Sequence, residues 1–185
     1  HNLDARSDLV LNYYQQHYED DNAYDAEFPP LLIDESVNTD RHNLEFTHSI
    51  YSDIYHLSWG LILRCDKSTA PQYLYQSTNT TSDTRQAFVN SEFFLNRHNI
   101  LNLILLADNN DTADTTWSPR VAFNHLFDSN HTLRISYARA NRSPFIFEEY
   151  TNYVVPGFGQ VYADLSDLDA ENIESVDIGY IGLFN

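Results

Sequence analysis

The chain alternates apolar and polar residues with a period of two over most of its length. In residues 55–66, for example, Trp59 and Leu61 fall on one side, whereas Ser58 and Arg64 fall on the other. Successive side chains of a β-strand point to opposite faces, so this pattern predicts a strand with one apolar and one polar face. The same reading predicts about eight strands, at residues 4–15, 41–51, 55–66, 85–95, 99–108, 117–128 and 131–140, with the last after residue 171.

The connections between these strands vary in length in a regular way. They cover residues 16–40, 52–54, 67–84, 96–98, 109–116, 129–130 and 141–171. Strands that pass up and down through a membrane are joined by short turns on one side and by longer loops on the other. One short helix is expected at 144–150, where Ser143 can cap a helix that starts at Pro144. The pattern therefore predicts an all-β protein whose antiparallel up-and-down strands form part of a transmembrane β-barrel.

Negative charge gathers on one side of the predicted sheet. The chain has 10 Lys and Arg against 27 Asp and Glu, a formal net charge of −17. Binding of nucleic acid requires a positive surface, so no nucleic-acid partner is expected. The acidic residues of the first and last long connections are Glu19, Asp20, Asp21, Asp25, Glu27, Asp34, Glu35, Asp40, Glu148, Glu149, Asp164, Asp167, Asp169 and Glu171. Because both connections lie on the same side of the strands, the sequence predicts an acidic rim.

In a membrane barrel the apolar faces contact lipid and the polar faces line the lumen. Four charged residues then face the lumen, namely Arg64, Glu92, Arg120 and Arg134. This orientation is favourable, because an arginine that faces lipid at the membrane midplane costs about 2–4 kcal/mol. These four side chains are candidate ligand contacts, and outer-membrane lipid is the expected partner of the opposite face.

Tyrosines in the predicted loops form a second set of candidate ligand contacts, namely Tyr73, Tyr75, Tyr150 and Tyr153. The charges of the chain favour two different ligand classes. Guanidinium groups in the lumen bind anions well, which favours an anionic metal chelate. The acidic rim favours a cationic or metal-bearing ligand. The sequence leaves both classes open.

The chain lacks the residue patterns of several other functions. No catalytic set is recognisable, so neither an enzymatic activity nor a cofactor is expected. The 8 histidines include no pair with the spacing of two metal ligands on one strand or one helix. The single cysteine, Cys65, excludes an internal disulfide framework and a multi-cysteine zinc site, and we expect an ordinary packed thiol there. No apolar run approaches the roughly 20 residues of a membrane-spanning helix.

Two motifs separated by a short turn carry a family resemblance. They are Trp117-Ser118-Pro119-Arg120 and Arg139-Ala140-Asn141-Arg142-Ser143-Pro144. In order and spacing they resemble the barrel domain of TonB-dependent outer-membrane receptors. Residues 88–93 and 171–180 are similar to neighbouring strands of that family, so the resemblance covers roughly residues 85–184. Residues 168–171 lack the lysine and proline that the family often carries there, which weakens any inference about ligand class.

The resemblance implies an energised importer of a scarce nutrient such as a ferric siderophore, haem or cobalamin. Such receptors have a barrel of about 22 strands in the bacterial outer membrane, closed by an N-terminal plug. They draw energy from a TonB-type protein through that plug. No plug is recognisable in this chain, and eight strands cannot close so wide a barrel. We therefore expect residues 1–185 to be a partial β-barrel segment of a larger receptor, and the absence of methionine agrees with a fragment.

Two other interpretations remain open at this point. The first is a complete eight-stranded outer-membrane barrel with a structural or adhesion role, which would require the first and last strands to pair. The second is a secreted soluble β-barrel or sandwich that binds a ligand. In that protein the apolar faces would form an internal core instead of a lipid-facing surface.

Overall fold

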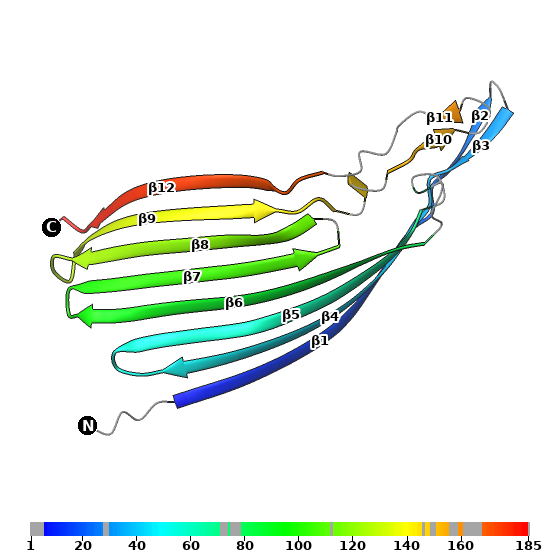
Figure 1. The fold of residues 1–185 in the computed structure, drawn as a ribbon. Coiled ribbons are helices and arrows are strands. Elements are labelled where there is room, and N and C mark those ends of the chain that lie inside the picture. Colours follow the sequence, from blue (N-terminus) through cyan, green and yellow to red (C-terminus); the bar gives the residue numbers. More distant parts are fainter. Residues whose placement is uncertain are drawn as a thin grey trace.

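The computed structural model describes residues 6–27, 30–70, 74, 79–111, 113–145, 147–148, 151–155, 159–160 and 168–184. Its main element is one antiparallel sheet of eight strands in the order β1-β4-β5-β6-β7-β8-β9-β12 (Figure 1). These strands are β1 (Arg6–Asp20), β4 (Val37–Tyr51), β5 (Tyr55–Thr69), β6 (Thr80–Asn96), β7 (Asn99–Asn110), β8 (Ala113–Leu126), β9 (His131–Arg142) and β12 (Glu171–Gly182). Within this sheet the strands lie side by side in the order in which they occur in the sequence. The predicted all-β, up-and-down arrangement is therefore confirmed.

Two small hairpins lie beyond the main sheet. One pairs β2 (Ala23–Glu27) with β3 (Pro30–Asp34), and the other pairs β10 (Val154–Val155) with β11 (Gly159–Gln160). Both lie at the end of the sheet that carries the long connections, opposite the short turns that follow β4, β6 and β8 (Figure 1). In the described part of the chain, no helix is long and apolar enough to cross a membrane.

The strands reach further toward the long connections than the sequence predicts. The segments 16–20 and 37–40, predicted as loop, pair with each other as parts of β1 and β4. The predicted loop at 109–116 is also wrong, because β7 and β8 leave only residues 111–112 between them. There the side chain of Asn110 accepts a 2.9 Å hydrogen bond from the backbone N–H of Ala113, which stabilises a tight turn.

The predicted helix at 144–150 is only partly present in the described residues. Phe147 and Glu148 are helical, but Pro144 and Phe145 are not, so a helix start at Pro144 is wrong. The remaining residues of that segment lie outside the described ones. The carboxylate of Glu148 accepts a 3.1 Å hydrogen bond from the backbone N–H of Phe145, so the turn is closed by this side chain.

The two faces of the sheet differ sharply in polarity. Large apolar side chains on one face are exposed, including Leu9, Leu61, Trp117, Val121, Ile135, Val176 and Ile178. The buried hydrophobic residues of the described chain are only Ala70, Leu74 and Ala122. The soluble alternative predicted an internal core made from the apolar faces, and these residues form no such core. A face of this kind matches a surface that contacts lipid.

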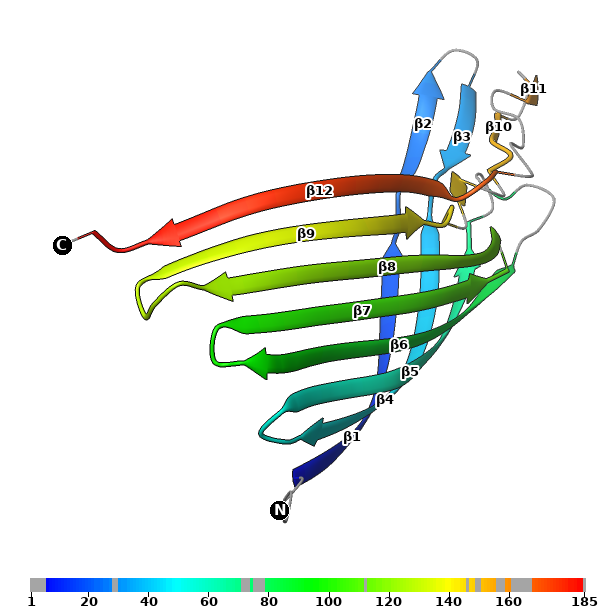
Figure 2. The ribbon, with the colours of Figure 1, turned by 60° about the vertical axis from the view of Figure 1, so that its left-hand side comes forward.

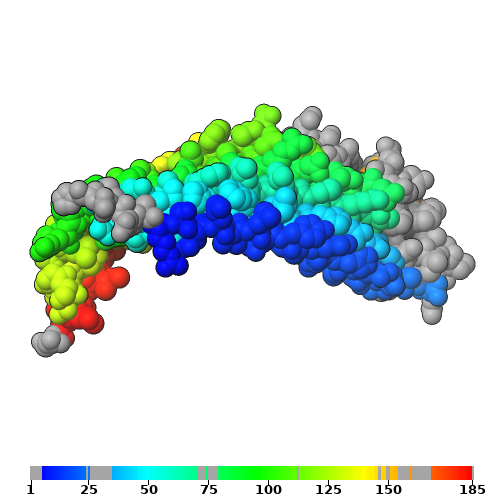
Figure 3. Space-filling model, turned by 90° about the horizontal axis from the view of Figure 1, so that it is seen from below, coloured from blue at the N-terminus to red at the C-terminus, as the bar shows by residue number. Residues whose placement is uncertain are grey.

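The sheet is curved and open. It curls so that β12 crosses in front of β1 and β4 in Figure 2, and from the β1 edge it has the outline of an arch (Figure 3). The first strand and the last strand lie at opposite edges and do not pair with each other. The closed eight-stranded alternative is therefore not what the structure shows. In lipid, the unpaired backbone groups of both edges require further strands as partners.

Gly60 illustrates how closely the strands pack on the polar face. A Cβ at this position would lie 2.3 Å from the backbone oxygen of Phe46 and 2.6 Å from the ring of Phe88. We expect Gly60→Ala to lower the free energy of unfolding by about 1–3 kcal/mol, because a backbone atom and a packed ring both have to move. Urea titration of the full-length protein in detergent measures this change.

Gly179 provides the matched control for that substitution. A Cβ there meets no atom within 4 Å, although Gly179 also lies inside a strand of the same sheet. We expect Gly179→Ala to leave the urea midpoint unchanged or to raise it slightly, because alanine restricts the unfolded chain more than glycine. Equal losses at the two positions would contradict the packing explanation for Gly60.

Candidate ligand-binding site

Two hollows lie on the polar face, which is therefore the concave face of the sheet. The outer hollow lies near the long connections, has a volume of about 520 Å³ and is lined by Arg41, Arg64, Asp66, Asp108, Arg142, Phe145 and Phe147, among others. The inner hollow lies nearer the short turns, has a volume of about 310 Å³ and is lined by His56, Ser58, Asn90, Glu92, Asn102, Ile104, Arg120, Ala122 and Arg134. Both are built across several strands, so sheet register determines which side chains meet.

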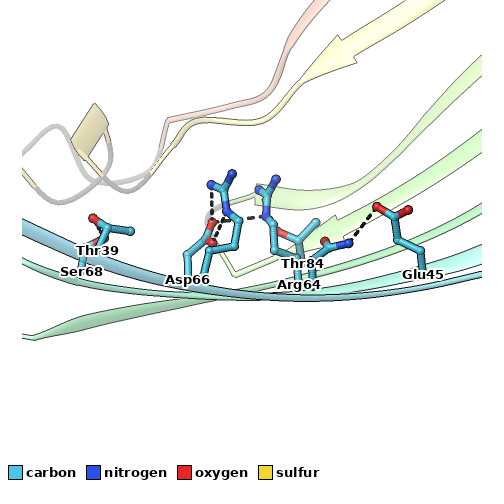
Figure 4. Close-up of polar contacts among 8 residues, drawn as sticks. Thr39, Glu45, Arg64, Asp66, Ser68 and Thr84 are labelled. Atoms are coloured by element: carbon cyan, nitrogen blue, oxygen red, sulfur yellow. Dashed lines mark hydrogen bonds and ion pairs between the residues drawn. The ribbon is translucent and has the colours of Figure 1, made fainter. Parts of the chain in front are cut away.

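Two arginines share one carboxylate in the outer hollow (Figure 4). The register places Arg41 of β4 directly opposite Asp66 of β5, and Arg64 lies two residues away on the same face. The Arg41 Nε donates to Asp66 Oδ1 at 2.6 Å, and Nη2 donates to Oδ2 at 3.1 Å. The Arg64 Nε lies 3.2 Å from Asp66 Oδ2. One carboxylate thus contacts two guanidinium groups, and among the described lining residues three arginines, Arg41, Arg64 and Arg142, stand against two aspartates, Asp66 and Asp108.

The three charged groups differ in their access to solvent. The side chain of Asp66 is 10% exposed, whereas those of Arg41 and Arg64 are 35% and 37% exposed. The Arg64 Nη2 also donates a weak hydrogen bond to Thr84 Oγ1 on β6, at 3.4 Å. The carboxylate is therefore held at the base of the hollow while both guanidinium groups remain accessible to a ligand.

A clasp around Arg142 forms the outer wall of this hollow. Arg142 donates two hydrogen bonds to the Glu148 carboxylate, at 2.7 and 3.1 Å, and its Nε donates to Glu171 at 3.1 Å. The guanidinium group holds the pKa of the Glu148 carboxyl below its usual value, and the N–H of Phe145 acts in the same direction. The clasp brings Phe145 and Phe147 to the hollow, with ring centroids 6.3 Å apart.

The inner hollow has a different charge arrangement. Glu92 accepts a 3.0 Å hydrogen bond from Asn102, and one of its oxygens lies 3.5 Å from His56 Nδ1. Asn124 in turn donates to Asn102 at 3.1 Å. Among the described residues, no hydrogen bond or ion pair joins the two arginines of this hollow to a carboxylate. Glu92 thus has Asn102 and His56 as its contacts, and neither arginine shares it as an ion-pair partner among the described residues.

The predicted lumen residues lie on one face, as expected, but in two separate places. Arg64 lines the outer hollow, whereas Glu92, Arg120 and Arg134 line the inner hollow. Their role as ligand contacts stays a prediction. The site residues that were not predicted are Arg41, Asp66 and Arg142. A usable signal was present, because each of them falls on the polar face of its own strand.

The predicted loop tyrosines are mostly beyond the described part of the structure. Tyr73, Tyr75 and Tyr150 lie outside the described residues. The hydroxyl of Tyr153 donates a 2.7 Å hydrogen bond to the carboxylate of Glu35, which ties the last long connection to the start of β4. Tyr153 is not among the described residues that line either hollow.

The described residues contain no cluster of metal ligands, and the cysteine of the chain forms no disulfide. No group of three or more His, Cys, Asp or Glu side chains among the described residues is arranged to hold a metal ion. Cys65 is a free thiol, half-buried, and lies on the opposite face from its neighbours Arg64 and Asp66. The side chains that line the two hollows offer charge, hydrogen bonds and aromatic rings to a ligand.

Comparisons with known proteins agree on the architecture. The family described as TonB dependent receptor-like, beta-barrel, matches residues 1–185. Among curated proteins, no relative matches the chain. Three solved structures show the same fold at low sequence identity.

The siderophore receptor PirA from Pseudomonas aeruginosa has a TM-score of 0.68 and 15% identity, over 95% of this chain and 36% of that chain. The siderophore receptor PirA from Acinetobacter baumannii gives 0.64 and 14%, over 97% of this chain and 30% of that chain. The copper transporter OprC gives 0.59 and 16%, over 95% of this chain and 32% of that chain. The chain therefore spans about a third of the length of the solved structures that it matches.

Proposed function

The chain belongs to the TonB-dependent receptor β-barrel family, and we propose that it forms part of the wall of an outer-membrane receptor that imports an anionic metal chelate such as a ferric siderophore. Proteins of this family are typically found in the bacterial outer membrane and act in nutrient uptake, not in catalysis. Energy would come from a TonB-type protein acting through a plug elsewhere in the receptor.

The observation that carries the ligand proposal is the shared carboxylate of the outer hollow. Arg41 and Arg64 line the hollow and share Asp66 as their one ion-pair partner among the described residues. Guanidinium groups are weakly hydrated and bind planar anionic oxygens well, so an anionic ligand is favoured over a cationic one. The rings of Phe145 and Phe147 add an aromatic wall against which a chelate can pack.

The similar structures support a metal-bearing ligand. Two of them are siderophore receptors and the third is a copper transporter, by their own descriptions. The proposal keeps the loop tyrosines Tyr73, Tyr75, Tyr150 and Tyr153 as further ligand contacts. The acidic rim would favour approach of the metal-bearing part, and the arginines would bind the anionic groups below it.

Replacement of Arg41 and Arg64 by glutamine tests this proposal in the full-length receptor. We expect uptake at limiting ligand to fall at least about tenfold, because two charge-assisted hydrogen-bonding groups are lost. Uptake is measured with radioactive iron bound to catecholate, hydroxamate or citrate chelators, in cells that lack other receptors, alongside haem and cobalamin. Arg139→Gln, on the opposite face of β9, is the matched control and is expected to leave uptake unchanged.

Two results would count against the proposal. Receptor-dependent uptake of none of these nutrients would overturn the transport function. Uptake that is unchanged in the double variant, with normal amounts of folded receptor, would remove Arg41 and Arg64 from the ligand site.

A further inference from the structure

Two histidines lie among exposed aromatic rings where the apolar face of the sheet reaches the short turns. His125 of β8 falls on the same face as Phe123 and Phe127, which are exposed apolar residues. His131 begins β9, and its backbone oxygen accepts a 3.0 Å hydrogen bond from the N–H of Phe127. Aromatic rings at the ends of membrane strands lie beside the lipid headgroups, so both histidines face the headgroup region.

His131 is held against β12 by a tyrosine and by the lack of a side chain opposite it. Its Nδ1 lies 2.6 Å from the hydroxyl of Tyr180, and the two rings are stacked with their centroids 5.9 Å apart. Gly182 pairs with His131, and a Cβ there would lie 2.8 Å from the same Nδ1. A tyrosine hydroxyl can donate to a neutral imidazole or accept from a protonated one. The contact is therefore compatible with both charge states of the histidine.

His125 also has a neutral partner, because its Nδ1 lies 2.7 Å from Oδ1 of Asn99. By contrast, His17 and His56 lie 2.8 and 3.5 Å from carboxylate oxygens. Among the described residues, no carboxylate lies within ion-pair distance of His125 or His131. Protonation of either imidazole therefore leaves its positive charge available to an external anion.

The surroundings of these two histidines are basic, although the chain as a whole is strongly acidic. Arg97 and His98 form the turn between β6 and β7, and the Nδ1 of His98 donates a 2.9 Å hydrogen bond to the backbone oxygen of Leu126. Residues 95–99, 125–131 and 180–185 contain one carboxylate, Asp128, in a chain of net charge −17. In this part of the described structure, the charged or titratable side chains around His125 and His131 are Arg97, His98, Asp128 and Tyr180.

Protonation of the histidines changes what this surface attracts. Imidazoles gain their charge as the pH falls from about 8 to 5. The positive groups then outnumber the carboxylate, and positive charge at headgroup depth attracts anionic lipid. The rings of Phe127 and Phe184 are 54% and 81% exposed and can contact acyl chains, from which a dissolved anion would gain nothing. No group of three or more metal-ligating side chains occurs among the described residues. The occupant that fits both the charge and the rings is an anionic phospholipid.

We propose that His125, His131 and the turn of Arg97 and His98 bind the phosphate of an anionic phospholipid when the two histidines are protonated. The imidazolium and guanidinium groups face the phosphate, and the neighbouring rings contact the acyl chains. Aromatic contact alone would hold any lipid. The histidines therefore supply the selectivity for an anionic headgroup and its dependence on pH. The inference rests on the membrane placement in the proposed function and is independent of the ligand that the receptor imports.

Photo-cross-linking to lipid in the full-length receptor tests this site. The photoreactive residue p-benzoylphenylalanine replaces Phe127 and, in a separate protein, Trp117, an exposed aromatic residue on the same face at the other end of β8. The receptors are folded into vesicles of equal parts phosphatidylglycerol, which is anionic, and phosphatidylcholine, whose headgroup has no net charge. After irradiation, mass spectrometry gives the ratio of the two lipid adducts at each position.

We expect the ratio of phosphatidylglycerol to phosphatidylcholine adducts at position 127 to be at least about fivefold higher at pH 5 than at pH 8. The ratio at position 117 is expected to change less than about twofold, because no histidine of the described structure adjoins it. His125→Gln with His131→Gln is expected to remove the rise at position 127. His42→Gln, an exposed position on the same face near the long connections, is the matched control and is expected to keep the rise. Heat-dependent mobility on gels confirms that the barrels compared are folded.

Three results would overturn the inference. They are an adduct ratio at position 127 that is the same at both pH values, a rise that persists in the glutamine double variant, and an equal rise at position 117. Lipid adducts at neither position would contradict the membrane placement itself. Adducts at both positions without dependence on pH would overturn the phospholipid site alone, and loss of uptake in a receptor that shows the rise would leave it intact.

Discussion

Arginine in place of Val121 is expected to lower the free energy of unfolding of the full-length receptor by about 2–4 kcal/mol, the cost of a lipid-facing arginine at the membrane midplane. Val121 is an exposed residue on the apolar face of β8, between Trp117 and Phe127. Residues 117 to 127 span about 33 Å as an extended strand. A tilt of about 40° reduces this to about 25 Å, the height of the apolar band of an outer-membrane barrel.

The expected loss of stability depends on how deep in the membrane the substituted position lies, and not only on the residue that is introduced. Thr115 lies on the same face of β8, two residues beyond Trp117, where the chain leaves the apolar band. We expect Thr115→Arg to cost at most about 1 kcal/mol, because the guanidinium group reaches the lipid headgroups. Arg120, next to Val121 in the chain, already shows that the strand tolerates arginine on the lumen side.

Urea unfolding in phospholipid vesicles compares these variants directly. Val121→Thr keeps the size of the side chain without the charge, and we expect it to cost less than Val121→Arg. Equal losses for arginine at positions 121 and 115 would contradict the membrane assignment of the apolar face. A large loss for Val121→Thr would instead indicate that this side chain packs against protein.

Contact with lipid on one face also explains which parts of the strands the sequence could predict. The central part of each strand alternates because one face contacts lipid and the other does not, so residues 55–66 and 131–140 were predicted close to their observed bounds. Residues 16–20 and 37–40 are mostly polar on both faces, yet they pair along the full register. Backbone hydrogen bonds need no apolar face, so the strands continue where the alternation ends.

Sequence alone located one of the three charged groups that meet in the outer hollow. Arg64 was predicted from the polarity of its own strand. Its partners were not, because the contact between Arg41 and Asp66 depends on how β4 and β5 pair. A slip of two residues in that register would keep Arg41 on the polar face but take it away from Asp66, and the alternation within either strand does not exclude such a slip. The residue types of a strand thus predict on which face of the sheet a side chain lies. A site built across two strands also requires knowledge of how those strands pair.

The clasp at Arg142 was missed for a related reason. Its two carboxylate partners, Glu148 and Glu171, come from opposite ends of the longest connection. The sequence places all three residues near that connection but contains no spacing rule that joins them. Only the return of the chain to β12, paired with β9 from Arg142 to His131, brings Glu171 beside Arg142.

Asp66→Asn is the second substitution with a large expected effect, about 2–4 kcal/mol of lost stability in the full-length receptor. Loss of one partner from a buried ion pair costs about 3–5 kcal/mol, and the partial exposure of Arg41 and Arg64 reduces that figure by screening. The amide retains the size of the carboxylate and one acceptor oxygen. What is lost is the only negative charge in contact with these two arginines among the described residues.

A double variant separates this electrostatic effect from a change in packing. Asp66→Asn combined with Arg41→Gln removes one charge of each sign, and we expect it to recover at least half of the stability lost by Asp66→Asn alone. Urea midpoints of the wild type, both single variants and the double variant complete the cycle.

Uptake responds to Asp66→Asn differently from stability, because this substitution keeps both guanidinium groups. Uptake of an anionic chelate per folded receptor is expected to be retained while stability falls. Uptake that falls as far as in the Arg41 and Arg64 double variant would show that the carboxylate, and not the arginines, contacts the ligand.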